Sequence, residues 1–408
     1  TMPGGLIQLV AVGAQDTHIT GNPNISFFKS KYKRHTRFSK ETIEEVIIGQ
    51  KPDFGKKITC NLSGKGDLLS YIVLEFVLPQ LTVSSGQVRW INGVGYKLVK
   101  SVEFEVGGVT IDKQYGEWYH LFDELSFTDS KSNNYQQILG RNAAYDANTG
   151  LIANTGTTII AFPLKFWFCN NIGSAFPIVA LNHNDIKLII EIEEFSKLYT
   201  LSNASATVTN ANLISMDIHS DYIYLSPEER SSIVNRDNNY MITQLQYSGE
   251  HRALAGQSTI NIPINFSHPV KELIWIIQRT DVATHSNNFG GNFWLNYSSS
   301  SGTSMLSTAK LSANGEDMMY DMKSYYFTKL VPFKHHTRVP SKHIYVYSFA
   351  LYPEKFQPSG TMNYSRVVNP RLHINFVSGT PEVNIRIYAI NYNFIQIKTG
   401  SLGIAYRN

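Results

Sequence analysis

The second half of this 408-residue chain repeats, in order, the features of its first half. Each half carries an apolar strand-like run, then two strands around a tight turn, then an aromatic strand and a further pair of strands. The matched runs are Leu68–Phe76 with Leu273–Ile277, Val102–Asp112 with Lys310–Asp317, Phe162–Phe168 with Ile344–Leu351, and Asp221–Leu225 with Asn391–Ile395. Four pairs in one order predict a single β domain that is built twice.

The turns inside these runs indicate antiparallel strands. Gly107-Gly108 in the first half and Asn314-Gly315 in the second are two-residue sequences that accept the positive φ angles of tight hairpins. Apolar and polar residues alternate over 100–112, as expected for strands in stacked sheets. The chain is therefore predicted to be all-β, with one sandwich in each half.

A short polar segment, 226–239, separates the two halves. Ser226 suits the N-cap of a helix, Pro227 its first position, and Glu229 the third position of a capping box. This segment is predicted to be a short linker helix, and a second helix is expected over 115–125.

Composition and charge narrow the class of protein. The chain is 42% hydrophobic and 17% charged, an ordinary balance for a globular protein, and its net charge of +4 is too small to indicate a nucleic-acid-binding protein. No apolar run approaches the length of a transmembrane helix, and residues 4–12 lack the charged region of a secretion signal. Cys60 and Cys169 are expected to be free thiols, as in a protein that folds in a reducing cytosol.

Positive charge gathers between residues 29 and 37. The five fixed cations there are Lys29, Lys31, Lys33, Arg34 and Arg37. Beside aromatic residues, such a cluster suits contact with phosphate or with another acidic partner. The same residues also suit a solvated strand edge, where lysines block unwanted pairing. The sequence leaves both interpretations open.

Long polar stretches between the strands are predicted to be loops that gather at the ends of the sandwiches and build a surface feature. These stretches are 126–157, 196–213, 281–307 and 354–370. Of six Asn-x-Ser sequons, those at Asn203 and Asn296 lie in such loops, and the others are expected in strand-like or turn contexts where a glycan would meet packing. These two asparagines are the candidates for glycosylation.

The sequence contains no nucleophile elbow, no His-Glu-x-x-His motif and no phosphate-binding loop. His335-His336 and the segment 182–185 are the best metal candidates, but neither has partners at ligand spacing, and both are expected to be polar loop residues. No cofactor or metal is therefore expected. Paired carboxylates occur at Glu193-Glu194 and Glu316-Asp317, but such pairs are common in β-sandwiches and their spacing does not show whether two carboxyl groups face one sugar ring. A carbohydrate-binding or carbohydrate-cleaving double β-sandwich protein is the alternative function.

Short motifs along nearly the whole chain resemble the major capsid proteins of nucleocytoplasmic large DNA viruses, of the chlorella-virus and marseillevirus type. The N-terminal thirty residues carry the most specific part of the resemblance. The matching residues are Gly4–Leu6, Gln8–Ala11, Gly13–Asp16, Thr20–Pro23, Phe27–Lys29, Gly66–Leu68, Ile111–Lys113, Ser348–Leu351, Gln357–Thr361, Asn363–Arg366, Tyr392-Asn393 and Gly403–Tyr406.

The resemblance implies a double jelly roll, that is, two consecutive eight-stranded jelly-roll β-sandwiches with short helices in the loops and at the joint. The implied division is an N-terminal arm over 1–24, a first jelly roll over 25–225, a linker helix over 226–239 and a second jelly roll over 240–408. This fold agrees with the duplication inferred from the repeated runs.

The resemblance also implies a structural role without enzymatic activity. Members look like homotrimers of pseudo-hexagonal outline, which contact neighbouring capsomers in the icosahedral shell of a virion assembled in the cytoplasm of the infected host. Residues 1–38 would face the inner side of the shell, towards minor capsid proteins and an internal membrane. The cations at 29–37 would then contact acidic partners, with no specific nucleic acid implied. The polar loops would form an outer tower.

Overall fold

The computed structural model describes residues 3–141, 157–181, 184–201, 203, 205–209, 211–283 and 294–406. The chain divides into two units, Thr1–Arg37 and Phe38–Asn408. In the first unit, helix α1 spans Gly4–Val10 and helix α2 spans Thr17–Thr20. None of the residues 3–37 is buried, so this unit has no hydrophobic core of its own.

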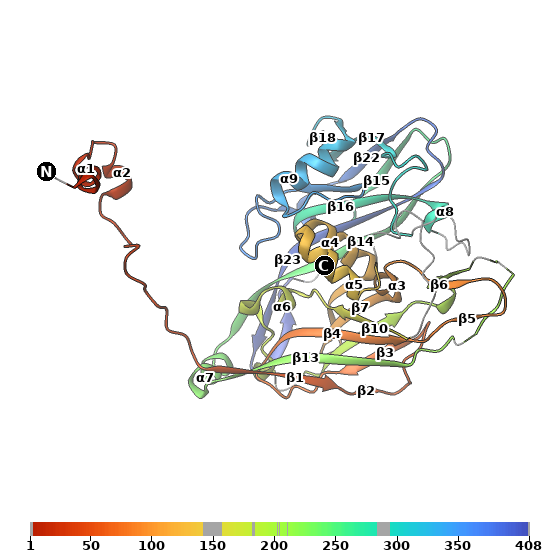
Figure 1. The fold of residues 1–408 in the computed structure, drawn as a ribbon, viewed down its shortest axis with the longest axis horizontal. Helices are drawn as coiled ribbons and strands as arrows, with labels where there is room; N and C mark the ends of the chain where they lie inside the picture. The colour runs from red at the N-terminus through yellow and green to blue at the C-terminus, as the bar shows by residue number, and fades with distance from the viewer. Residues whose placement is uncertain are drawn as a thin grey trace. The chain divides into compact units, whose positions relative to one another are not determined.

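The second unit begins with a β-sandwich that we call the first roll (Figure 1). One of its sheets has the strand order β1-β13-β4-β9, and the other β2-β3-β10-β7-β8. The strands are β1 (Phe38–Glu45), β2 (Ile47–Ile48), β3 (Lys57–Asn61), β4 (Leu68–Leu78), β7 (Val99–Val106), β8 (Val109–Tyr115), β9 (Thr158–Pro163), β10 (Ile186–Ile192) and β13 (Ser215–Leu225). Two small ribbons extend it, β5 (Thr82–Val83) with β12 (Val208–Thr209) and β6 (Val88–Trp90) with β11 (Tyr199–Leu201).

A second sandwich, the second roll, follows. One sheet has the order β14-β23-β16-β20 and the other β15-β22-β17-β18. The strands are β14 (Asn238–Ala253), β15 (Thr259–Pro263), β16 (Pro269–Arg279), β17 (Leu306–Ala313), β18 (Glu316–Asp317), β20 (Ile344–Ser348), β22 (Arg371–Phe376) and β23 (Val383–Lys398). Short strands β19 (Met322–Lys323), β21 (Met362–Asn363) and β24 (Ser401–Ile404) pair with β17, β16 and β23.

The two rolls have the same topology. In the first roll β13 pairs with β1 and β4, and β4 also pairs with β9. In the second roll β23 pairs with β14 and β16, and β16 also pairs with β20, so β1-β13-β4-β9 corresponds to β14-β23-β16-β20. The predicted hairpin turns also correspond: Gly107 and Gly108 join β7 to β8, and Asn314 and Gly315 join β17 to β18, all with positive φ. The predicted all-β double jelly roll is confirmed; among the described residues, the two main sheets contain nine strands in the first roll and, without the short strands β19, β21 and β24, eight in the second.

Burial along the strands explains the sequence pattern. Strand β10 alternates buried and half-buried residues, since only one of its faces meets the core of the first roll. Nearly all of β16 is buried, because Leu273 and Trp275 point into the second roll while Ile274 and Ile276 join the core cluster of the first roll. The continuous apolar run at 273–277 therefore reflects a strand that is covered on both faces.

Short helices fill the connections. They are α3 (Val94–Leu98), α4 (Gly116–Ser126), α5 (Asp129–Ile138), α6 (Trp167–Asn170), α7 (Pro227–Val234), α8 (Thr280–Ala283) and α9 (Val331–His335), with single 3-10 or π turns at η2 (Ile172–Ser174), η3 (Ile178–Ala180), η4 (Phe195–Lys197), η5 (Tyr326–Leu330) and η6 (Tyr364–Arg366). The helix expected over 115–125 is α4. None of the helices within the described ranges is long and apolar enough to cross a membrane.

Two details at the joint and in the loops differ from expectation. Helix α7 begins after Ser226 as predicted, but the Ser226 side chain makes no capping hydrogen bond and β14 already begins at Asn238. The stretch 126–157 was expected to be a loop, but it contains α5, and residues 142–156 lie outside the described residues. The predicted domain boundaries themselves stay a prediction.

Candidate functional site

Helix α4 joins the two rolls, lying against strand β23 of the second roll (Figure 1). On β23, the guanidinium of Arg386 donates to both carboxylate oxygens of Glu117 on α4, with Nε–Oε2 and Nη2–Oε1 distances of 2.7 Å. The Tyr388 hydroxyl donates to Glu117 Oε2 at 2.8 Å. Burial disfavours the charged guanidinium, but the attraction of Glu117 is stronger and holds the pKa of Arg386 above its usual value. A buried bidentate ion pair therefore links the rolls.

A second link between the rolls is Asp112 on β8. Its Oδ1 accepts a hydrogen bond from the backbone N–H of Leu245 on β14 at 2.9 Å, and its Oδ2 accepts one from Gln114 Nε2 at 2.9 Å. Burial raises the pKa of Asp112 to about 7, although both hydrogen bonds favour the carboxylate. The carboxyl of Asp112 in the first roll thus accepts a hydrogen bond from a backbone N–H of β14, which is an edge strand of the second roll.

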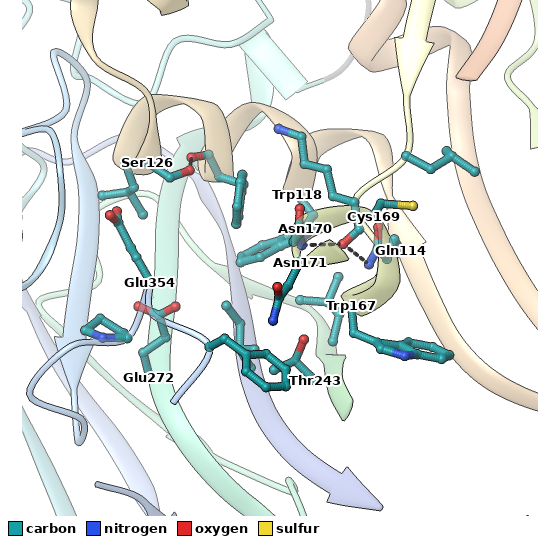
Figure 2. A pocket seen from close by; sticks show the side chains of 18 of the residues that line it. Gln114, Trp118, Ser126, Trp167, Cys169, Asn170, Asn171, Thr243, Glu272 and Glu354 are labelled. Carbon is teal, nitrogen blue, oxygen red and sulfur yellow. Dashed lines mark hydrogen bonds between the residues drawn. The ribbon is translucent and has the colours of Figure 1, made fainter. Parts of the chain in front are cut away.

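A cleft of about 510 Å³ lies beside these links, and we call it the inter-roll cleft. In the first roll it is lined by α4, α6 and the beginning of α5, and in the second by β14, β16 and the loop 353–356. Figure 2 shows Gln114 and Asn170 hydrogen-bonded to one shared acceptor. That acceptor is the backbone carbonyl of Lys165, at 3.1 Å from Gln114 Nε2 and 3.0 Å from Asn170 Nδ2. The floor of the cleft is therefore held by a small polar network.

The imidazole of His336 lies deep in the cleft and is already paired with carboxylates. His336 lies between two carboxylates, with Nε2 3.2 Å from Glu272 Oε2 and Nδ1 3.0 Å from Glu354 Oε1. Burial opposes protonation of this imidazole, but the two carboxylates outweigh it and raise the pKa of His336 to about 9. Lys271 Nζ donates to the carbonyl of Pro353 at 2.6 Å. These ion pairs and the hydrogen bond connect β16 to the segment after α9 and to the loop 353–356.

His335 and His336 were predicted to be polar loop residues, but His335 is the last residue of α9, whereas His336 follows the helix. The side chain of His336 is only 2% exposed, and His335 is half-buried, with its Nδ1 3.0 Å from the carbonyl oxygen of Leu351. No cluster of three or more potential metal-ligating side chains occurs among the residues that the structure describes. Of the segment 182–185, residues 182 and 183 lie outside the described residues.

The predicted contact residues Lys29, Lys31, Lys33, Arg34 and Arg37 are all exposed. They share the first unit with three exposed aromatic side chains, at Phe27, Phe28 and Tyr32. The segment therefore combines charge and apolar surface, but its partner stays a prediction.

The two glycosylation candidates differ in environment. Asn203 is exposed, its Nδ2 donates to Ser85 Oγ at 3.0 Å, and its Oδ1 accepts from the backbone N–H of Ser205. Asn296 is half-buried, and its Oδ1 accepts from the Ser298 hydroxyl at 2.7 Å. Modification of either residue stays a prediction, and Asn203 is the more exposed of the two.

Sequence reasoning missed an exposed aromatic surface around α9. Phe333 is 76% exposed, Tyr325 60% and Tyr320 88%, and Leu351 and Tyr352 in the following loop are 64% and 54% exposed. The backbone of Leu351 is held next to α9 by His335. We call these five residues the α9 patch. These five positions form no periodic pattern in the sequence, so no sequence signal indicated that they share a surface.

Comparison with known proteins follows the same division of the chain. The family described as "Major capsid protein N-terminus" matches residues 26–226, and the family described as "Large eukaryotic DNA virus major capsid protein" matches residues 229–403. The major capsid protein of Pyramimonas orientalis virus is 37% identical, and that of Paramecium bursaria Chlorella virus 1 is 32% identical, both over the full length of each chain.

Solved structures with a similar fold include capsid proteins. The VP54 capsid protein of PBCV-1 matches with a TM-score of 0.80 and 28% identity, covering 94% of this chain and all of that one. The Faustovirus major capsid protein has the same fold, with a TM-score of 0.78 at 13% identity, covering 95% of this chain and 94% of that one. The chain therefore belongs to the major capsid proteins of large eukaryotic DNA viruses and is a component of the virion capsid.

Proposed function

We propose that three copies of this chain form a homotrimeric capsomer of pseudo-hexagonal outline, and that these capsomers tile an icosahedral shell. The observation that carries this proposal is the duplicated topology, with β1-β13-β4-β9 matched by β14-β23-β16-β20 in one unit. A threefold assembly of chains with two similar rolls presents six similar faces, which suits hexagonal tiling. In this proposal the chain has a structural role and catalyses no reaction.

The α9 patch supports a contact between subunits. Monomeric proteins rarely expose a contiguous apolar surface of several aromatic side chains. Obligate interfaces, in contrast, are large, apolar at the centre and enriched in Tyr and Phe. Since Phe333, Tyr325 and Tyr320 are mostly exposed in the single chain, we assign the patch to the trimer interface.

The first unit suits contact with other shell components. Its five cations and exposed aromatic side chains have no core to join within residues 3–37. In the proposal this unit lies at the inner face of the shell, near an internal membrane, and contacts acidic surfaces of minor capsid proteins. Assembly would take place in the cytoplasm of the infected host cell.

Sedimentation velocity and negative-stain microscopy of the purified chain test the trimer. We expect a species of three chains with a six-sided outline at micromolar concentration. A stable folded monomer under these conditions would contradict the proposal.

The role of the first unit has its own test. Replacing Lys31, Lys33 and Arg34 by Ala should leave the trimer intact and impair closure of the shell or docking of minor capsid proteins. Loss of the trimer itself would show that this segment belongs to the subunit interface instead. A salt-steep affinity for DNA that falls in the variant would instead assign the cations to nucleic acid.

A further inference from the structure

We propose that the inter-roll cleft is a docking site for a peptide segment of another protein, in which an aromatic or long aliphatic side chain is flanked by carboxylates. The inference concerns a cleft within one chain and does not depend on the trimer. Three properties of the cleft carry it: its walls, an unpartnered acceptor in its floor, and the charges at its mouth.

Several aromatic side chains line the cleft. Trp118 and Phe122 come from α4, Trp167 from α6, Phe127 from the turn after α4, and Phe356 from the second roll. Figure 2 shows Trp118 and Trp167 among the side chains around the hollow. A cleft of about 510 Å³ lies within the size range of sites that bury one small ligand or a few side chains. An apolar side chain is therefore the part of a ligand that this space accepts.

Gln114 places an unpartnered acceptor at the floor of the cleft. Its Nε2 donates to Asp112 Oδ2 and to the backbone carbonyl of Lys165, and since a carbonyl can only accept, the orientation of the amide is fixed. Its Oε1 is then left without a hydrogen-bond partner among the described residues, although Gln114 is only 4% exposed. A buried acceptor without a donor is costly. The ligand is therefore expected to bring an N–H or O–H group to this oxygen.

The mouth of the cleft is positively charged. Lys131 Nζ lies 4.5 Å from the centroid of the Phe127 ring, and Lys355 Nζ lies 4.6 Å from that of Tyr352. Both lysines are exposed, and neither forms an ion pair with a residue that the structure describes. The deeper charge of His336 is already matched by carboxylates. The charge that remains to be complemented at the mouth is therefore positive.

A peptide fits these three properties better than the other ligands that share part of them. A fatty acid would supply a carboxylate and a hydrocarbon chain, but no donor for Gln114. A nucleotide would supply a ring and a donor, but it concentrates its charge in one phosphate group. Lys131 belongs to α5 of the first roll and Lys355 to a loop of the second, so the two cations belong to different walls. Carboxylates on either side of an apolar residue match that placement.

Fluorescence anisotropy of the full chain with a labelled probe tests the inference. The probe is the capped pentapeptide Glu-Glu-Phe-Glu-Glu, compared with one peptide in which Lys replaces each Glu and one in which Ala replaces Phe. We expect saturable binding of the first peptide below about 1 mM and at least roughly tenfold weaker binding of the other two.

Variants locate the binding site. Lys131→Glu combined with Lys355→Glu should weaken binding of the acidic peptide by roughly tenfold or more. Lys65→Glu is the matched control, because Lys65 is an exposed lysine in a turn of the first roll that does not line the cleft, and it should leave binding unchanged. Thr243→Trp should fill the cleft and abolish binding. Thermal melting of each variant shows whether it is folded.

The following results would overturn the inference. They are no saturable binding of the acidic peptide at about 1 mM, equal binding of the lysine peptide, or equal loss of affinity in the Lys65→Glu control. Binding of oleate or adenosine monophosphate in place of the peptide would assign the cleft to a lipid or a nucleotide. Peptide binding that appears only when trimers are dissociated would show that a second copy of this chain occupies the cleft.

Discussion

At the scale of single residues, the junction between the rolls depends on buried charges that are paired across it. Arg386 and Glu117 come from different rolls, and their side chains are 10% and 15% exposed. Neither charge could be buried alone without a cost of several kcal/mol. Pairing therefore specifies which surfaces of the two rolls meet, as well as holding them together.

Arg386→Ala is expected to lower the free energy of unfolding by about 3–5 kcal/mol, because it leaves the Glu117 carboxylate buried without its partner. Urea denaturation at a fixed protein concentration measures the change. Arg252→Ala is the matched control: Arg252 pairs with Glu382, but its side chain is 66% exposed, so the loss should be at most about 1 kcal/mol. Equal losses in the two variants would contradict the role given to the buried pair.

His336 predicts a dependence of stability on pH. Its pKa is raised from 6.5 to about 9 in the folded chain, so the protonated form is favoured by folding. The resulting stabilisation is fully present below about pH 6.5 and is lost as the pH rises through about 9, by roughly 3 kcal/mol in total. Unfolding free energies measured at intervals over this range should fall in the wild-type chain.

His336→Gln should remove that fall, even if the variant is less stable at every pH. Asp112, whose pKa is raised from 3.8 to about 7, also favours its protonated form in the folded chain, so its stabilisation is lost between about pH 4 and 7. Comparing the unfolding free energies of the wild-type chain and the variant above pH 7 separates the contribution of His336 from that of Asp112. An unchanged slope between pH 7 and 9 in the variant would show that His336 is not the titrating group.

At the scale of elements, the solvent exposure of apolar side chains differs between the core strands and the short helices in their connections. Strand β16 is buried on both faces, while Phe333 on helix α9 and Tyr325, which directly precedes the π turn η5, are exposed to solvent. A π turn within a helical segment often marks a functional position. The exposed aromatic side chains therefore belong to an element placed for contact, not to an incompletely packed core.

If the α9 patch forms the proposed trimer interface, Phe333→Glu should shift the assembly from trimer towards monomer, because it places a charge on an exposed aromatic residue of that patch. The shift should exceed tenfold in the dissociation constant, measured by sedimentation equilibrium. Leu254→Glu is the control, since Leu254 is also an exposed apolar residue, at 64%, but lies outside the α9 patch. A trimer that survives Phe333→Glu and not Leu254→Glu would place the interface elsewhere.

At the scale of the whole second unit, the rolls share apolar packing. The main core cluster contains Phe104 and Leu188 of the first roll together with Ile274 and Tyr388 of the second. Trp118 on α4 contacts the ring of Tyr388, with centroids 5.9 Å apart. Each roll therefore buries part of its apolar surface against the other.

We expect Phe104→Ala to lower the free energy of unfolding by about 3–5 kcal/mol, since Phe104 is fully buried and contacts several other rings. Because the cluster spans both rolls, calorimetry should show one transition that moves as a whole to lower temperature. Two transitions, only one of them shifted, would show that the rolls unfold independently.

Much of the fold could be read from the sequence because strands and turns have local signatures. The apolar run at Leu273–Ile277 and the turns at Gly107-Gly108 and Asn314-Gly315 predicted the strands and hairpins that the structure contains. The capping hydrogen bond expected at Ser226 is absent, since a cap depends on the rotamer that the surroundings permit. Helix α5 was missed because its polar sequence carries no apolar stripe.

The sequence by itself determined that one β domain occurs twice, because period-2 alternation, tight turns and the repeated order of runs are properties of neighbouring residues. Only the tertiary structure decided which side chains meet between the two copies. Gln114, Glu272 and His336 are far apart along the chain and ordinary in their local sequence, yet they line one cleft. Burial and pairing of polar groups depend on contacts between distant strands, and these contacts exist only once both rolls are folded against each other.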